Sequence, residues 1–597
     1  MRARFDIYLL VALLFGVFVL QQTLNEGVTS DGCLYFAHLR SLVFDGDLQI
    51  DPELQLLHLT DRSQHVVPIG PAIVWAPLYL LVTSVDWAAG VAGVWTRASG
   101  TARGLTGLYV QAAFFSSFAI AAAGLLALHL RIRRDLGGAN ALLASLLTLA
   151  ATPLAWYVIV EPSMTHAASF GVVALALVLT ERWLIDRKPS RRQAIMLGCW
   201  FALVIVVRPE DGLFLLFPLA ALWLAAPHRA TPLIERARIA GEMAIGAMPL
   251  ILAQLVMLSY LRSASSFALT GDEGYLTLFA SEWMNVLFSS RHGLLSWTPA
   301  VWIALIGTAI YARRQPLWAI PSLLVFAGLV WINGSAHDWS GGWAFGGRRF
   351  TSAAAALAPG FAVALAWLRR HPLAVLVPAV TAIVGWNGLL MTQYDRQMIP
   401  RDETVRFDTL VKQQADVYLK PPYFYPFAFP ANAWFAWREG LPIDRYDLLG
   451  SEPLRKELYL PLNDWSERFL LDGWSNGAGD RFGSRHFLSA QQGTIAVPLD
   501  VPSAVPFSVD VEARAEGAAD RGMAALDVSV NGHSFGEIAL TIGAEAPTRR
   551  AFVAPAGSKV WRRGYNRVTI ARRDVPLTIP VIVYALRVGP VTQARTP

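Results

Sequence analysis

The first apolar run of the chain, Leu9–Leu20, is followed by Thr29-Ser-Asp-Gly-Cys-Leu-Tyr-Phe-Ala-His-Leu-Arg-Ser-Leu-Val-Phe-Asp-Gly-Asp-Leu48. Only 16% of all residues are charged, yet three carboxylates fall here, at Asp31, Asp45 and Asp47, together with Tyr35. Such a set directly after an apolar span indicates a binding or catalytic site. The other interpretation is that Asp31-Gly32 and Asp45-Gly46 are turn signals flanking a short surface helix, with Asp31 near its N-cap.

The composition is that of a protein that crosses a membrane several times. Of 597 residues, 54% are hydrophobic, 21 are tryptophan, and the mean hydropathy is +0.41, which is more apolar than soluble domains usually are. The formal net charge of +6 comes largely from Arg and Lys clusters between apolar spans. Such clusters mark cytoplasmic loops and do not indicate nucleic-acid binding. The two cysteines, Cys33 and Cys199, predict no disulfide framework.

The basic clusters define the predicted topology. They place the N-terminus on the cytoplasmic side, and we interpret the first apolar run as an uncleaved signal anchor. The other predicted cytoplasmic segments are residues 131–134, 182–192, 228–238, 313–314 and 369–371. Loop 21–66 then lies outside, and about eleven full spans are expected. Two crossings between residues 68 and 130 would put Arg131–Arg134 outside. We therefore predict a re-entrant or interfacial helical hairpin over 68–95; the alternative is a tolerated exception at Arg131.

The composition changes after the last predicted span, so residues 1–393 are predicted to form an α-helical polytopic membrane domain. Residues 394–460, which include the aromatic and proline-rich stretch Lys420–Pro430, predict a linker that lies on the membrane surface. Residues 461–597 hold short β-rich runs broken by Gly, Asn and Asp, and Asn531-Gly532 predicts a hairpin turn. This pattern favours a β-sandwich of jelly-roll type, on the outer side of the membrane.

Polar clusters recur in the loops assigned to the outer side. After the first loop come Glu161 and His166, then Arg208, then Arg291 with His292, and finally Asp338, Trp343, Arg348 and Arg349. Acids and bases on one side of a membrane suit a ligand that must lose a proton and also carries negative charge. A sugar linked through phosphate to a polyprenyl tail is such a ligand, because its phosphate sits at the interface and its sugar projects outward.

Each group of residues then has a predicted role. Arginine forks bind phosphate oxygens well, which assigns the phosphate to Arg208, Arg291 with His292, Arg348 and Arg349; the alternative for each arginine is snorkelling to headgroups. A carboxylate is the natural base for the acceptor hydroxyl, and Asp31 is our choice. Glu161 either assists by binding the acceptor or the sugar, or merely starts a helix before Pro162. The predicted substrate-binding residues are Tyr35, Asp45, Asp47, His166, Asp338 and Trp343, although a hydrogen-bonded interior role is favoured for His166.

Other chemistries lack a matching pattern. No paired Cys or HExxH motif indicates zinc, and Gly341, Gly342, Gly346 and Gly347 lack the strand before and the helix after that a nucleotide fingerprint needs. Carboxylates and histidines could bind a divalent ion, but no spacing demands one. The predicted co-substrate is therefore a lipid-linked sugar, with no metal assigned.

Several short motifs occur in a telling order: Ser30-Asp31-Gly32 with Tyr35, His65-Val-Val-Pro-Ile-Gly-Pro71, Glu161-Pro-Ser-Met-Thr-His166, Arg208-Pro209, Ser290-Arg-His-Gly293 and Phe345-Gly-Gly-Arg-Arg-Phe350. Over residues 1–392 the chain thereby resembles the GT-C superfamily of polyprenyl-phosphate-sugar glycosyltransferases, in particular the bacterial branch similar to protein O-mannosyltransferases and lipid A aminoarabinose transferases. The resemblance implies catalysis by Asp31, and phosphate binding by Arg208 and Arg348-Arg349. The chain departs from its relatives at Val66-Val67-Pro68, where they carry two adjacent prolines.

The resemblance leads to the hypothesis of a glycosyltransferase in the inner membrane of a bacterium. A hexosyl or pentosyl group would move from a polyprenyl phosphate to an envelope glycan, lipid or protein on the periplasmic face, with inversion by direct attack. The β-sandwich resembles carbohydrate-binding modules, so it either holds a glycan acceptor, with Trp474, Arg481, Arg485 and His486 as candidates, or acts as a spacer. The competing hypotheses are a flippase for lipid-linked sugars, which would need polar residues inside its spans, and a non-catalytic glycan-binding membrane anchor.

Overall fold

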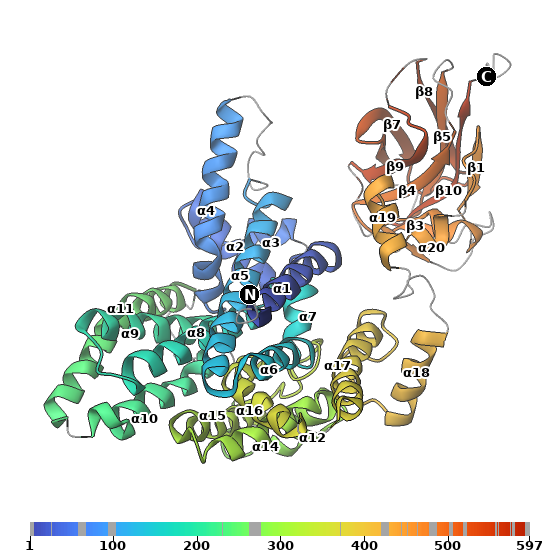
Figure 1. The fold of residues 1–597 in the computed structure, drawn as a ribbon. Coiled ribbons are helices and arrows are strands. Elements are labelled where there is room, and N and C mark those ends of the chain that lie inside the picture. The colour runs from blue at the N-terminus through green and yellow to red at the C-terminus, as the bar shows by residue number, and fades with distance from the viewer. Residues whose placement is uncertain are drawn as a thin grey trace. The chain divides into compact units, whose positions relative to one another are not determined.

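The computed structural model describes residues 5–25, 27–57, 67–92, 103–229, 231–261, 276–369, 372–419, 429–442, 445–450, 452–462, 464–476, 486–500, 506–517, 522–555, 558, 560–573, 575 and 579–591. The chain forms two compact units, Met1–Val417 and Tyr418–Pro597, the first helical and the second mainly β (Figure 1). The predicted combination of a helical domain and a β-sandwich is confirmed, whereas boundaries at 393 and 460 stay predictions. His65, Arg481, Arg485 and residues 420–428 lie outside the described residues.

The helical unit contains the following helices: α1 (Phe5–Leu24), α2 (Asp31–Phe44), α3 (Asp51–Leu56), α4 (Gly70–Val91), α5 (Gly107–Leu136), α6 (Gly138–Ala150), α7 (Leu154–Ile159), α8 (Thr165–Thr180) with η3 (Glu181–Ile185), α9 (Arg191–Val207), η4 (Pro209–Leu215), α10 (Leu216–Leu224), η5 (Ala226–His228), α11 (Leu233–Leu261), α12 (Trp283–Phe288), α13 (Leu294–Trp297), α14 (Ala300–Tyr311), α15 (Pro316–Ser335), η6 (Arg348–Phe350), α16 (Ala353–Leu368), α17 (Leu373–Asp395) and α18 (Phe407–Leu419).

Among the described residues, seven helical segments are long and apolar enough to cross a membrane: Phe5–Leu24, Gly70–Val91, Gly107–Leu136, Thr165–Ile185, Leu233–Ser259, Pro316–Ser335 and Val375–Asp395. Three shorter apolar helices, α6, α14 and α16, accompany them. The polytopic helical class is confirmed by these lengths and compositions. The total of about eleven spans stays a prediction.

The hairpin predicted over 68–95 is wrong, because α4 is one continuous helix. No turn-forming pair interrupts its apolar sequence, and Pro77 is accommodated inside it. α4 runs antiparallel to α5: the Trp75 indole donates to the Ser117 hydroxyl (2.9 Å), and one turn later Tyr79 meets Tyr109 at 4.9 Å between ring centroids. α4 therefore leads toward the start of α5, and it stands out from the rest of the helical unit in Figure 1.

The opposite end of α5 belongs to a face on which several basic helix ends meet. Asp6, at the start of α1, accepts from the Arg133 guanidinium at 2.7 Å. Buried Arg131 donates to Glu181 at the end of α8 (2.8 Å) and to the Tyr311 hydroxyl at the end of α14 (2.8 Å). Arg131 thus shares a face with the start of α1, as the prediction that both are cytoplasmic requires.

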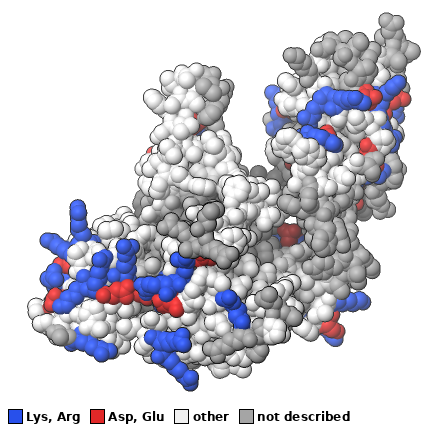
Figure 2. All heavy atoms as spheres, viewed as in Figure 1, with Lys and Arg blue, Asp and Glu red and all other residues white. Residues whose placement is uncertain are grey.

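Basic side chains also gather where α9, α10 and α11 lie in Figure 1, with acidic groups among them, as Figure 2 shows. The chain supplies Arg187, Lys188, Arg191, Arg192, Arg229 and Arg238 here, all exposed. Lys188 lies 3.6 Å from Glu235 of α11. This face, which includes Arg131 and Asp6, is called the basic face below.

The second unit contains α19 (Phe429–Glu439), α20 (Tyr446–Leu449), β1 (Leu458–Pro461), η8 (Asp464–Phe469), β2 (Trp474–Asn476), β3 (His486–Leu488), β4 (Gln492–Leu499), β5 (Phe507–Ala515), β6 (Met523–Val530), β7 (His533–Thr541), β8 (Thr548–Ala554), β9 (Gly564–Arg572) and β10 (Val581–Pro590). One sheet has the order β2-β3-β10-β5-β8, with β1 beside β10, and the other has the order β4-β9-β6-β7.

Both sheets contribute to one apolar core, for example through Val511 of β5 and Leu526 of β6. Burial alternates strictly along β5, as expected for a strand with one face packed against a core. Asn531 and Gly532 take φ values of 50° and 83° between β6 and β7. The predicted hairpin turn is therefore confirmed, because a two-residue turn of this type needs positive φ at both positions.

Candidate functional site

The start of α2 is fixed against the loop that holds Glu161 and His166. The Thr29 amide donates to the Ser163 hydroxyl at 3.3 Å. Gly32 lies so close that a Cβ atom would be 2.5 Å from the Ser163 hydroxyl oxygen and 2.9 Å from its carbonyl oxygen. Only glycine permits this approach. Asp31, at the first position of α2, is thereby held beside a loop that lies 130 residues further along the sequence.

Tyr35 lies one turn after Asp31 on the same face of α2. It is buried, and its hydroxyl lies within the electrostatic reach of Asp31, Arg208, Arg348 and Glu210. Burial, reinforced by Asp31, raises the pKa of Tyr35 well above its usual value of 10, so the hydroxyl stays protonated and can donate a hydrogen bond. The acid after the first helix and the arginines of two later loops therefore surround one tyrosine.

His166 and Arg208 form the inner wall of this site. His166, buried at the start of α8, has its Nδ1 3.2 Å from an Arg208 guanidinium nitrogen, and its ring packs against that of Tyr157 in a tilted arrangement, with 4.3 Å between ring centroids. Arg208 ends α9, pairs with Glu210 and also donates to the Arg349 carbonyl at 3.5 Å. The Arg208 guanidinium therefore already has three partners within the protein.

Asp211 forms the floor beneath Arg208. Its side chain is fully buried, and it accepts hydrogen bonds from Ser169 of α8 (2.5 Å) and from Ser352, which precedes α16 (2.7 Å). Three segments far apart in the sequence are thus joined at one carboxylate. The sequence near Asp211 does not indicate this role, because its serine partners come from other helices.

Most of the predicted phosphate ligands have carboxylate partners inside the protein. Arg349 donates to Asp338 at 2.7 Å, and two nitrogens of the Arg291 guanidinium donate to one oxygen of Asp402 at 2.9 and 2.7 Å. Arg291 also lies over the Trp339 ring, at 6.0 Å. Their charges are therefore largely balanced before any ligand binds.

Arg348 differs from these arginines. Across the described part of the chain its guanidinium has no hydrogen-bond or ion-pair partner, and its side chain is half-buried. Its charge nevertheless reaches the side chains of Tyr35, Tyr157, His166 and His292. Arg348 is thus a cation in the centre of the site whose charge the described carboxylates leave available.

His292 is another side chain within the electrostatic reach of Arg348. It is buried, and its Nδ1 lies 3.1 Å from the Ser340 carbonyl, which assigns the proton to Nδ1. Burial is the main reason that its pKa falls to about 4. His292 is therefore neutral at pH 7 and does not add positive charge to the site.

The structure separates other predicted residues from Asp31. Asp45 pairs with Arg40, and Asp47 accepts from the Ser41 hydroxyl at 2.6 Å, both at the far end of the 14-residue α2. That end lies roughly 21 Å from Asp31 along the helix. Both carboxylates shape the loop after α2, and their predicted contact with a substrate is untested, as is that of Trp343, which is 76% exposed. Glu161 lies near the site through its electrostatic contact with Tyr157.

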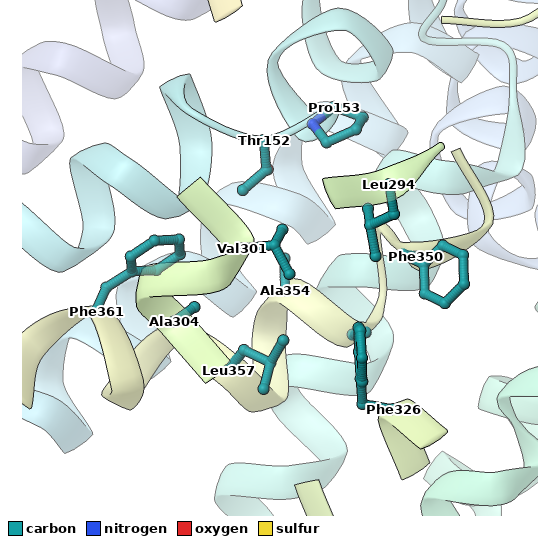
Figure 3. A pocket seen from close by; sticks show the side chains of 11 residues that line it. Thr152, Pro153, Leu294, Val301, Ala304, Phe326, Phe350, Ala354, Leu357 and Phe361 are labelled. Carbon is teal, nitrogen blue, oxygen red and sulfur yellow. The ribbon is translucent and has the colours of Figure 1, made fainter. Parts of the chain in front are cut away.

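A small apolar cavity lies directly behind the arginine pair. It has a volume of about 10 Å³ and is lined by side chains that include Leu294, Phe326, Phe350 and Leu357 (Figure 3). This is room for about one water molecule. The cavity is therefore a packing feature between α14, α15 and α16 that supports η6.

Among the described residues, no group of three or more His, Cys, Asp or Glu side chains is placed to hold a metal ion.

No family model and no curated protein matches the chain. Among solved structures, the chain is similar to ArnT from Cupriavidus metallidurans bound to undecaprenyl phosphate, at 16% identity over 66% of this chain and 65% of that one, with a TM-score of 0.39. It is also similar to the arabinosyltransferase EmbB from Mycobacterium smegmatis, at 11% identity over 98% of this chain and 65% of that one, with a TM-score of 0.34.

A third similarity concerns a carbohydrate-binding module, the CBM36-1 domain of a xylanase from the hindgut metagenome of Trinervitermes trinervoides. It has 12% identity, covers 23% of this chain and 98% of that domain, and has a TM-score of 0.18. The chain spans 65% of the length of each of the two transferases. At such values no activity follows from these similarities. Function is therefore argued below from the site itself.

Proposed function

We propose that the helical unit is a glycosyltransferase that moves a sugar from a polyprenyl phosphate to an acceptor hydroxyl. The observation that carries this proposal is the convergence on Tyr35 of Asp31, from directly after the first helix, and Arg348, from more than three hundred residues later. A base and an available cation in one site match the two needs of the reaction, which are a proton acceptor and a group that stabilises the leaving phosphate.

In the proposed reaction the acceptor oxygen attacks the anomeric carbon, and the bond from that carbon to the phosphate oxygen breaks. The proton of the acceptor hydroxyl passes to the Asp31 carboxylate. Polyprenyl phosphate leaves with one additional negative charge, which Arg348 stabilises. Direct attack inverts the anomeric configuration. Tyr35, which stays protonated, donates a hydrogen bond to the donor, and Arg208, Arg349 and Glu161 support the site as positioning residues.

We further propose that the site faces the periplasm of a bacterium and the basic face its cytoplasm. His166 and Glu181 lie at opposite ends of the α8–η3 helix, so the site and the basic face lie on opposite sides of the helical unit. α17 ends beside the site, where Tyr394 meets His292 at 6.4 Å. The β unit that follows α17 would then be periplasmic, and the acceptor an envelope glycan, lipid or protein.

The test uses the purified full chain, radiolabelled polyprenyl-phosphate hexose and pentose donors, and an envelope extract as acceptor. Asp31→Asn is expected to lower transfer at least about 100-fold, in the range of a lost general base, while its affinity for undecaprenyl phosphate changes little. Asp51→Asn, an exposed carboxylate in the same loop, is the matched control and keeps full activity. Full transfer by Asp31→Asn would refute the assignment of the base.

The donor class needs a separate readout. If wild-type protein transfers no label from any polyprenyl phosphate and does not bind undecaprenyl phosphate, the proposed reaction is wrong. If it binds the lipid phosphate and moves it between the leaflets of proteoliposomes without transfer, the flippase hypothesis takes its place.

A further inference from the structure

The β unit carries a pair of exposed tryptophans on α19. Trp434 is 60% exposed and Trp437 is 75% exposed, and their rings meet at 4.9 Å between centroids. Because they are three residues apart, they lie on one face of the helix, and exposed Arg438, four residues after Trp434, lies on the same face. These three residues are called the tryptophan face below.

The opposite face of α19 fixes the helix to the β unit. Phe435 is buried, and its ring lies 5.4 Å from that of Tyr565 in β9. The side-chain oxygen of buried Asn432 accepts a hydrogen bond from the Tyr446 amide at 3.0 Å. The buried face therefore sets the orientation of α19 against the β unit (Figure 1), and the tryptophan face points away from the core of that unit.

The two indoles of the tryptophan face are not used by the fold. Among the described residues, neither indole N–H has a hydrogen-bond partner. Trp474 of β2 is different, because its ring is half-buried and its indole donates to the Thr494 carbonyl at 3.0 Å. Trp434 and Trp437 thus present both an apolar ring and a polar N–H outward. A surface in which an apolar layer adjoins a polar one would satisfy both parts of each indole.

A positive charge lies at the end of α19. Arg562 is exposed, and its guanidinium donates to the carbonyls of Glu439 (2.6 Å) and Tyr565 (2.9 Å). Within the ranges that the structure describes, Arg562 has no carboxylate partner. Arg438, by contrast, donates to the Glu439 carboxylate at 2.7 Å. Arg562 therefore offers its charge to an anion that approaches the tryptophan face.

The chain also keeps α19 close to a membrane helix. α17 holds the last of the described segments that are long and apolar enough to cross a membrane. α18 is fixed at the end of α17, where the Gln393 amide donates to the Leu410 carbonyl at 3.0 Å. Leu419, which ends α18, and Phe429, which starts α19, are ten positions apart in the sequence, a reach of at most about 35 Å. This connection gives the tryptophan face a high effective concentration at a bilayer surface.

We propose that the tryptophan face docks the β unit on the lipid bilayer, with both indoles in the headgroup layer and Arg562 bound to lipid phosphate. Tryptophan is enriched at membrane–water interfaces because its ring is apolar and its N–H is polar. Arginine binds phosphate oxygens, and positive groups are attracted to anionic lipids. A glycan or a second copy of the chain would use neither Arg562 nor the short connection to α18. The proposal does not depend on the proposed transfer.

Spin labels in the full chain test the proposal, in nanodiscs of phosphatidylethanolamine and phosphatidylglycerol. Cys199→Ser removes the exposed native thiol, and Cys33 is buried. A nitroxide attached at Trp437→Cys should lie about 5–10 Å deep, as for other helices in a bilayer interface. Its depth is measured from its collisions with oxygen and with a water-soluble nickel complex. Adding Trp434→Ser should move this label toward water.

The charge of Arg562 needs its own comparison. Arg562→Gln should also move the label at position 437 toward water in the phosphatidylglycerol nanodiscs, but not in nanodiscs of phosphatidylcholine, which has no net charge. Both substituted side chains are exposed in the wild-type chain. Thermal unfolding of each variant should therefore match that of wild type.

The matched control is a label at Met523→Cys, an exposed position at the start of β6. The other end of β6 leads to Asn531, which donates to the Val560 carbonyl, two residues before Arg562. Met523 lies seven residues from that end, roughly 23 Å along the strand, so this label should stay in water.

Three results would overturn the proposal. The first is a label at position 437 that is as accessible to the nickel complex as the label at position 523, which is also the result expected if the face awaits a glycan. The second is broadening between labels at position 437 on two copies at low protein density, which would place a second copy on this face. The third is an unchanged depth in both Trp434→Ser and Arg562→Gln.

Discussion

Replacing Arg348 by glutamine tests whether the available cation of the site holds the lipid phosphate. A hydrogen bond to a charged group contributes about 1.5–3 kcal/mol, which corresponds to an affinity loss of about 10- to 150-fold for undecaprenyl phosphate. Arg348 has no partner among the described residues, so its removal leaves no described carboxylate unpaired. The variant should therefore fold as stably as wild type.

The paired arginine Arg291 provides the contrast. Its guanidinium is already bound to Asp402, so Arg291→Gln should change the affinity by less than about threefold, as expected for a group whose charge is balanced within the protein. Arg348→Lys should fall between wild type and Arg348→Gln, because lysine keeps the charge but loses the planar fork. Arg406→Gln, at an exposed ion pair with Asp408, is the control.

Binding of undecaprenyl phosphate to the full chain in lipid nanodiscs supplies the measurement, with thermal unfolding as the check on folding. The reasoning would be refuted if Arg348→Gln bound undecaprenyl phosphate within about threefold of wild type while Arg291→Gln lost more than about tenfold in affinity. The phosphate would then lie beside Arg291, and the availability of a cation would not identify the ligand site.

Three further predictions concern the supports of the site. Gly32→Ala should lower the transfer rate about tenfold or more by pushing α2 from Ser163, and adding Ser163→Gly should restore part of that rate. The pKa of His292, about 4 against the usual 6.5, means that the unfolded chain binds a proton first as pH falls. The contribution of His292 to stability is therefore full above pH 6.5 and falls by up to about 3 kcal/mol toward pH 4. Thermal unfolding at pH 7 and 5 should show a smaller loss for His292→Gln than for wild type, while other buried histidines such as His38, whose pKa is also about 4, act in both proteins. Arg131→Met should cost roughly 3 kcal/mol by leaving buried Glu181 with Arg134, seen as a lower Tm with unchanged affinity for undecaprenyl phosphate.

Local patterns were enough to predict several parts of the fold. Asn531-Gly532 turns where its sequence predicts, because the requirement for positive φ at two neighbouring positions involves no other part of the chain. The basic cluster at Arg131 also lies beside the start of α1, so the two segments that the prediction places on one side share a face. The prediction of a hairpin over 68–95 was wrong because it assumed that a continuous helix there would have to end on the opposite face of the helical unit. Instead, α4 is continuous and runs toward the start of α5.

Local sequence patterns could not predict which arginine of the site pairs with which carboxylate. Arg291 and Asp402 are 111 residues apart, and Arg208 reaches the Arg349 carbonyl across 141 residues. Nothing near Arg348 in the sequence distinguishes it from Arg349, yet only Arg349 contacts Asp338. The sequence could therefore supply the set of cations, but not the one whose charge is available to a ligand.

The buried carboxylate of Asp211 bears on the choice between a transferase and a flippase. A flippase must open its site alternately to the two sides of the membrane, so helices that line the site have to separate on the far side. Here the floor of the site is closed by hydrogen bonds from α8 and from the start of α16 to Asp211, which is fully buried. Opening toward the basic face would break both bonds and would leave a buried carboxylate without partners, which is energetically expensive. A transferase requires no such movement, because donor and acceptor approach the same side. The closed floor therefore favours group transfer over transport.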